Sequence, residues 1–127
     1  MSEEQIIDLG TVNLIWSDWY PWDRFKEDAR SGGLSVPNHR SGVYEAKLIA
    51  HDERLTIGMA SNLRMRIKHG LVKGKTPHSS GDDIRAYEET ADVVIRWAET
   101  ERPAAIEEEL HLQHKRLFGR NPKYTDH

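Results

Sequence analysis

Residues 41–70 read SGVYEAKLIAHDERLTIGMASNLRMRIKHG, and this stretch decides the fold that the sequence predicts. Apolar and polar residues alternate with a period of two through residues 42–50, which is typical of a β-strand. Residues 54–60 alternate in the same way after a short polar connection. The two segments predict an antiparallel hairpin with Tyr44 on its more apolar face.

A basic helix is predicted directly after the hairpin, at about residues 62–69. Ser61 is a suitable N-cap, because its hydroxyl can accept a hydrogen bond from a free backbone N–H of the first turn. Gly70 is a suitable C-terminal stop. Leu63 and Ile67 supply the apolar stripe that would face the sheet.

The remaining elements alternate between helix and strand. Residues 81–89 predict a short helix, 91–99 a third strand and 102–119 a long helix. The apolar face of the long helix is predicted to hold Ile106, Leu110, His114 and Leu117. Together these elements predict an α+β domain, in which helices flank a small, mainly antiparallel three-stranded sheet.

The first forty residues differ from the rest because aromatic residues cluster in them. Residues 16–25 contain Trp16, Trp19, Tyr20, Trp22 and Phe25. Such a cluster can cover one side of a core, or it can form a platform on which bases stack. We expect residues 1–40 to be an extension packed on a core domain formed by residues 41–127, with a short helix starting near Pro21.

Composition restricts the class of protein. The chain has 127 residues, 37% hydrophobic and 31% charged, which suits one globular domain. It contains no cysteine, so disulfides and cysteine-ligated metals are excluded. No apolar run is long enough to cross a membrane and the N-terminus has no secretory pattern, so we expect a cytoplasmic protein without a membrane partner.

The charge distribution is more informative than the net charge of −3, which gives no overall attraction to nucleic acid. Residues 64–78 contain five cationic side chains and no acid. These are Arg64, Arg66, Lys68, Lys73 and Lys75. Such a run is either a solvated face or a surface for a phosphate backbone.

The spacing of these motifs resembles that of the GIY-YIG nuclease family. Gly42-Val43-Tyr44 stands where that family has its first motif, and Thr56-Ile57-Gly58 where it has the second. Arg66 falls at the position of the family's arginine, and His69 where a histidine is common. The helix at 102–119 is similar to the one that carries the family's glutamate. The resemblance covers residues 42–125.

The chain departs from the family pattern at two positions. Thr56 replaces the tyrosine of the second motif, and its shorter hydroxyl would leave a gap. Thr125 replaces the terminal asparagine, unless Asn121 fills that role. Both changes concern activity more than fold.

Three consecutive glutamates are candidates for the family's metal ligand. With about 100° per residue in an α-helix, Glu107 lies about 60° from the centre of the stripe at Leu110. Glu108 lies about 160° away and Glu109 about 100° away on the other flank. A site between helix and sheet needs a carboxylate at the edge of the stripe, which selects Glu107.

The resemblance implies a division of chemical roles. Tyr44 would be the general base or orient the attacking water, and Arg66 would bind the scissile phosphate. Glu107 would hold one divalent ion, Mg²⁺ or Mn²⁺, that stabilises the leaving oxygen. His69 would relay protons or bind phosphate. Supporting positions would be Gly42, Thr56, Gly58 and Thr125, and nucleic-acid contacts would come from Arg64, Lys68, Lys73, Lys75 and His78.

Other interpretations of the same residues remain open. Tyr44 could be a core tyrosine with a hydrated hydroxyl, and His78 a simple loop histidine. Glu107, His111 and His114 could form a zinc site. The function implied is a metal-dependent DNA endonuclease, acting alone, as a homodimer or with a protein partner. The alternative is a catalytically impaired domain that binds nucleic acid or protein.

Overall fold

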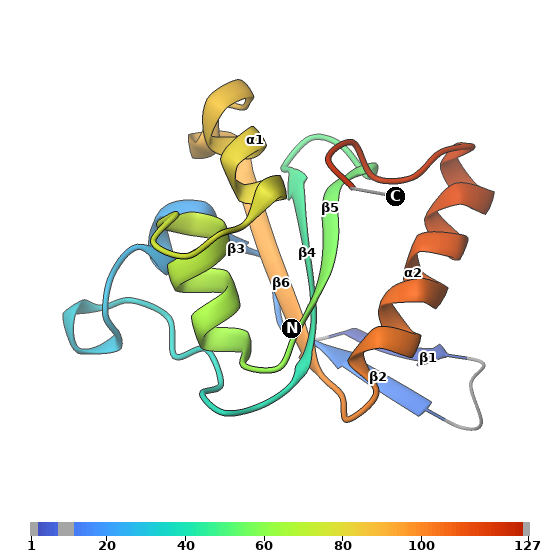
Figure 1. Ribbon diagram of the computed structural model, residues 1–127, viewed down its shortest axis with the longest axis horizontal. Helices are drawn as coiled ribbons and strands as arrows, with labels where there is room; N and C mark the ends of the chain where they lie inside the picture. The colour runs from blue at the N-terminus through green and yellow to red at the C-terminus, as the bar shows by residue number, and fades with distance from the viewer. Residues whose placement is uncertain (1–2, 8–11, 126–127) are drawn as a thin grey trace.

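The computed structural model describes residues 3–7 and 12–125 (Figure 1). Its strands and helices follow one another along the chain in an order that mixes α and β structure. The strands are β1 (Glu3–Ile7), β2 (Val12–Trp16), β3 (Tyr20–Pro21), β4 (Gly42–Leu48), β5 (Arg54–Ala60) and β6 (Val93–Glu99). The helices are η1 (Trp22–Phe25), η2 (Ala29–Ser31), η3 (Met65–Val72), α1 (Ser79–Tyr87), η4 (Thr90–Asp92) and α2 (Pro103–Phe118).

The predicted α+β class is confirmed, but the predicted three-stranded sheet is wrong. The main sheet has four antiparallel strands in the order β3-β6-β4-β5. The added strand β3 is only two residues long, and it pairs Tyr20 with Ile95 and Pro21 with Val94. A proline is tolerated there because β3 lies at the edge of the sheet, where its missing N–H breaks no ladder.

A second sheet, which the sequence analysis did not predict, consists of β1 and β2 alone. The two strands pair antiparallel from Glu3 with Trp16 to Ile7 with Val12. Ile7 and Trp16 are fully buried, so this small sheet has one apolar face. That face packs on the main sheet, which compensates for the low stability of an isolated hairpin.

The predicted hairpin of β4 and β5 is confirmed. The register places Tyr44 opposite Gly58 and Ala46 opposite Thr56. Since strand side chains alternate between faces, Tyr44 and Glu45 point to opposite sides of the sheet. Because of this alternation, the sheet makes one set of contacts on each of its two faces.

One face of the sheet is covered by η1, η3 and α1, and the other by α2 and the β1–β2 sheet (Figure 1). Tyr44 belongs to the first core cluster and Val43 to the second. Trp22 and Phe25 are at most 1% exposed in the first cluster. These aromatic residues therefore form core, while Trp19 and Tyr20 are half-buried. The helix expected near Pro21 is the single 3₁₀ turn η1.

Two details of the predicted helices are wrong. The helix predicted for 62–69 continues to Val72 through Gly70, and Met65–Val72 is a π-helix with wider turns than an α-helix. The long helix was placed correctly, but Leu117 is 77% exposed, because it lies at the open end of α2 beyond the core. Ile106, Leu110 and His114 are buried as predicted.

The segment that follows α2 returns to the main sheet. The backbone N–H of Lys123 donates to the carbonyl of Arg54 at 3.2 Å, and that of Tyr124 donates to Leu55 at 2.8 Å. These bonds lie on the outer side of β5, which is an edge strand. Within the described part of the chain, no helix is long and apolar enough to cross a membrane.

Candidate functional site

Tyr44 is held in the core by its cross-strand neighbour Gly58. A Cβ on Gly58 would lie 2.3 Å from both Cζ and Oη of Tyr44, so the tyrosine ring lies directly over the glycine backbone. Only glycine permits this approach. The ring thus crosses β5, and its hydroxyl is carried towards the outer edge of the sheet.

The hydroxyl of Tyr44 forms a hydrogen bond with Nε2 of His78 at 2.7 Å, in a buried environment. Nδ1 of His78 accepts a hydrogen bond from the backbone N–H of Gly81 at 3.0 Å. A neutral imidazole whose Nδ1 accepts must carry its proton on Nε2. His78 therefore donates to Tyr44, and the phenol proton remains available for another acceptor.

The position of His78 follows from the way α1 begins. His78 is the N-cap of α1, and its ring takes the place of the usual short polar side chain at that position. The hydroxyl of Thr56 donates to Ser80 at 3.1 Å, and Ser80 donates to the carbonyl of Tyr124 at 2.6 Å. The gap expected beside Thr56 is thus occupied by the first turn of α1, which brings His78 to Tyr44.

Arg66 and Glu107 line one surface cavity of about 470 Å³. Arg66 comes from η3 and Glu107 from the first turns of α2, so elements on both sides of β5 meet there. The guanidinium of Arg66 donates to the carbonyl of Pro77 at 3.1 Å, which fixes its orientation. Neither Arg66 nor Glu107 forms an ion pair with another described residue. The cavity therefore presents one cation and one carboxylate to a ligand.

The electrostatic surroundings connect Tyr44 to this cavity. Burial raises the pKa of Tyr44 to about 12, against a lowering by the charge of Arg66 and a hydrogen bond from it, and with a smaller increase from Glu107. Tyr44 is only 2% exposed and does not itself line the cavity. The three predicted residues are thus close neighbours, with the phenol behind the open part of the site.

His69 is not brought to this group. It lines a different cavity with Arg64 and Lys68. The wider turn of the π-helix rotates each residue less than an α-helix does, so a residue three positions after Arg66 falls further short of a full turn. His78 comes nearer to the tyrosine instead, packing beside the backbone of Gly70.

The other predicted site residues have various positions. Gly42 is buried where β4 meets β6. The hydroxyl of Thr125 is buried without a hydrogen-bond partner among the described residues. Asn121 lines a further cavity beside Glu107. Lys75 lies exposed in the loop after η3.

The alternative zinc site finds no support. In the described ranges 3–7 and 12–125, no three histidine, aspartate or glutamate side chains are grouped as metal ligands. Nε2 of His114 accepts from the backbone N–H of Arg54 at 3.1 Å, and its Nδ1 bonds to the carbonyl of Arg120 at 2.7 Å. Both nitrogens of His114 are therefore engaged in holding the end of α2 against β5.

The residues of the cavity do fit a single hard divalent ion. Mg²⁺ keeps several of its waters and often binds through one or two carboxylates together with phosphate oxygens of a substrate. Glu107 supplies one half-buried carboxylate at the cavity wall. Such an ion would share the cavity with Arg66.

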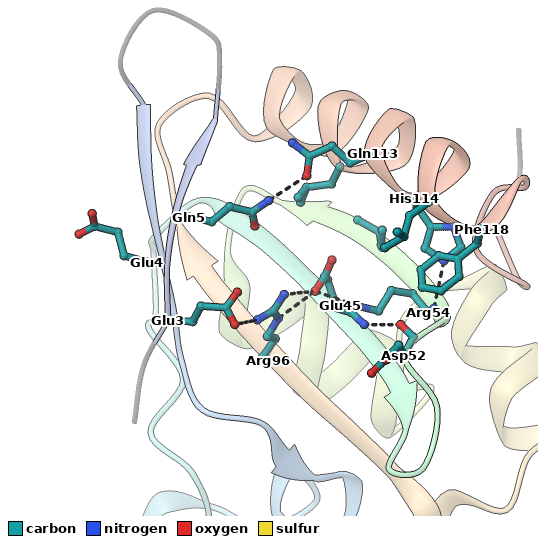
Figure 2. Close-up of a pocket in the computed structure, with 13 residues that line it drawn as sticks. Glu3, Glu4, Gln5, Glu45, Asp52, Arg54, Arg96, Gln113, His114 and Phe118 are labelled. Atoms are coloured by element: carbon teal, nitrogen blue, oxygen red, sulfur yellow. Dashed lines mark hydrogen bonds and ion pairs between the residues drawn. The ribbon is translucent and has the colours of Figure 1, made fainter.

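The opposite face of the sheet has a larger cavity, of about 550 Å³, built around Glu45 (Figure 2). One carboxylate oxygen of Glu45 accepts from Nε of Arg54 at 3.1 Å and from Nε of Arg96 at 2.8 Å. Arg96 also reaches Glu3 of β1 at 3.3 Å. This cluster ties four strands together, β1, β4, β5 and β6, and its charges are paired, so we assign it a structural role.

Comparison with protein-family models, with curated proteins and with solved structures found no match. The resemblance to the GIY-YIG nucleases therefore remains a prediction that rests on motif spacing. The geometry adds residues that spacing alone did not assign. The sequence predicted His78 as a nucleic-acid contact or a simple loop histidine, and it gave Ser80 no role. The pattern HSSGDD at residues 78–83, a polar residue before early acids, was the available signal for a capped helix start.

Proposed function

We propose that this protein is a metal-dependent endonuclease that hydrolyses phosphodiester bonds in DNA, with a GIY-YIG-like site. The observation that carries the proposal is the grouping of Arg66 and Glu107 in one cavity, with the Tyr44 phenol close behind it. These residue types are the ones that phosphodiester hydrolysis needs: a cation for the phosphate, a carboxylate for a metal and a group that accepts a proton.

Each side chain has a role that its surroundings support. Arg66 presents a planar guanidinium, which suits two oxygens of a phosphate. Tyr44 accepts the proton of the attacking water, and the hydrogen bond from Nε2 of His78 stabilises the phenolate that this requires. Glu107 holds the divalent ion, which supplies stabilisation of the leaving oxygen when bound.

A second candidate is a domain that keeps this fold for binding and has lost turnover. The burial of Tyr44 favours it, since a phenol that is 2% exposed with a pKa of about 12 is a poor base at neutral pH. In that case the cavity would bind nucleic acid or protein without cleaving it. The two candidates differ in whether substrate and metal bring the phenol into contact with water.

A cleavage assay on supercoiled plasmid with Mg²⁺ or Mn²⁺ tests the proposal. We expect nicking by the unmodified protein and a loss of about 10²-fold or more in Tyr44→Phe and Glu107→Ala. Glu108→Ala is the matched control, because Glu108 is the next residue of α2 but does not line the cavity of Arg66. Its rate should stay within about twofold.

Two results would contradict the endonuclease. One is equal activity in Glu107→Ala and the unmodified protein. The other is no cleavage of plasmid, branched or single-stranded DNA by a folded protein. If that inactive protein still retards DNA in a gel, the binding module becomes the better description.

A further inference from the structure

A basic cavity borders η3 on the side that carries Arg64, Lys68 and His69. It has a volume of about 300 Å³ and is lined on one wall by η3 and on the other by residues 28–34. Its cationic side chains come from two distant parts of the chain: Arg30, Arg64, Lys68 and Lys73, joined by His69. Asp28 is the one acid of its lining.

The two sides of η3 separate this cavity from the site of Tyr44. Arg64 and Arg66 are two residues apart on the helix, and residues with that spacing do not share a face. Accordingly Arg64 lines the outer cavity and Arg66 lines the cavity of Glu107. The basic run that the sequence shows as continuous is therefore divided into two sites.

The cations of this outer cavity outnumber its acid, because Asp28 is the one carboxylate of the lining and its charge only opposes the lowering of the pKa of Lys68 and His69. None of its four lysines and arginines forms an ion pair with a described residue, whereas Arg54, Arg85, Arg96 and Arg120 elsewhere all do. Nε of Arg64 donates to the carbonyl of Val36 at 2.8 Å, which fixes the guanidinium by one edge. Like charges held close together repel one another unless an anion lies between them.

Among these cations, Lys68 gives the strongest argument for a bound anion. It is 5% exposed, and its ammonium donates to the carbonyl of Glu27 at 3.1 Å. A nearly buried ammonium normally has a charged partner, because removing it from water is costly. Burial and the charges of Arg64 and Lys73 lower the pKa of Lys68, and burial, Lys73 and Lys75 lower that of His69. A bound anion would reduce the repulsion between these positive charges.

We propose that the outer cavity of η3 binds a phosphate group. Arg64 and Lys68, each held by a backbone carbonyl, form its base, and the less buried Arg30 and Lys73 contact the anion from opposite walls. The phosphate belongs either to a nucleic-acid backbone or to a small phosphorylated ligand. The site does not depend on the reaction proposed for the cavity of Arg66, because it shares no residue with it.

Calorimetric titration of the full chain with sodium pyrophosphate, at low ionic strength and without metal, tests this. The double variant Arg30→Ala, Lys73→Ala should weaken pyrophosphate binding tenfold or more. These side chains are chosen because they are not buried, so the fold should persist, whereas Lys68→Ala would also lose the contact with Glu27. Lys115→Ala, an exposed cation of α2, is the control and should bind within twofold.

A second arm identifies the source of the phosphate. Affinity for a labelled single-stranded oligonucleotide is measured by anisotropy at several salt concentrations, with Lys115→Ala again as the control. If the site holds a nucleic-acid backbone, the double variant should reduce the slope of log affinity against log salt by about one to two. An unchanged slope with lost pyrophosphate binding supports a small phosphorylated ligand. No pyrophosphate binding by the unmodified protein, or equal binding by the double variant, overturns the proposal.

Discussion

Tyr44 and Glu45 are neighbours on β4, and they bury polar atoms on opposite faces of the same sheet. Tyr44 meets one neutral imidazole, that of His78. The side chain of Glu45 forms ion pairs with two guanidinium groups, those of Arg54 and Arg96. Strand β4 therefore carries a neutral hydrogen-bonded pair on one face of the sheet and a cluster of ion pairs on the other.

The comparison distinguishes a cluster of ion pairs that stabilises the fold from a hydroxyl group that is a candidate for catalysis. A buried carboxylate is tolerated only when its charge is compensated, and Arg54 and Arg96 provide that at Glu45. Such a group has little freedom to react. The Tyr44 hydroxyl forms a hydrogen bond with the neutral imidazole of His78, and the charges of Arg66 and Glu107 act on its pKa. The three predictions that follow test this contrast, in order of decreasing effect.

Removing the charge of Glu45 should have the largest effect. Glu45→Gln leaves Arg96, which is 5% exposed, without its main counter-charge. We expect the free energy of unfolding in urea to fall by about 3–5 kcal/mol. Glu4→Gln, an exposed position of β1 beside the same cavity, should change it by less than about 0.5 kcal/mol. A loss below about 1 kcal/mol for Glu45→Gln would mean that the cluster is not structural.

Gly58→Ala should be next. Its methyl group would lie 2.3 Å from the Tyr44 ring, so the ring must move away from His78. We expect a loss of about 3 kcal/mol in stability, at the upper end for overpacked cores. In a Tyr44→Ala background the same change should cost much less, because the clashing ring is absent. Additive losses in this double-mutant cycle would contradict the assigned contact.

The Tyr44–His78 pair should produce a smaller, pH-dependent effect. Burial, with help from Arg66 and Arg85, lowers the pKa of His78 to about 4. The folded protein keeps His78 neutral while the unfolded chain binds a proton near pH 6.5, so stability is lost as pH falls from about 6.5 to 4. By pH 5 the loss should be about 2 kcal/mol.

His78→Gln should remove this dependence, as measured by urea unfolding from pH 8 to pH 4.5. His51→Gln alters an exposed histidine and should leave the dependence unchanged. Identical pH profiles for His78→Gln and the unmodified protein would show that His78 is already accessible to protons in the folded state. That result would also weaken the argument for a neutral donor at Tyr44.

The sequence predicted elements whose pattern is local. Alternation located β4, β5 and β6, and the stripe with Ile106 and Leu110 located α2. It failed where tertiary contacts decide the structure. Strands β1 and β3 are short and owe their stability to pairing and packing on the main sheet.

The candidate site was predictable in the same partial way. The family resemblance selected Tyr44 and Arg66, and helix geometry selected Glu107 among three glutamates. Arg66 and Glu107 line one cavity, and the charges of both act on Tyr44. His69 was selected from its place in the family pattern, whereas the structure places it in the outer cavity. His78 lies 34 positions from Tyr44, so no local pattern reveals their contact.

The return of residues 122–125 to the edge of β5 has a consequence for self-association. An uncovered edge strand presents free N–H and C=O groups that a second chain can pair with. Lys123 and Tyr124 occupy the carbonyls of Arg54 and Leu55 on that edge. Pro122→Gly combined with Tyr124→Gly should loosen the segment, and light scattering should then show concentration-dependent growth of particles. Residues 122–125 would thus protect this edge from pairing with a second copy of the chain, a role unrelated to either proposed phosphate site.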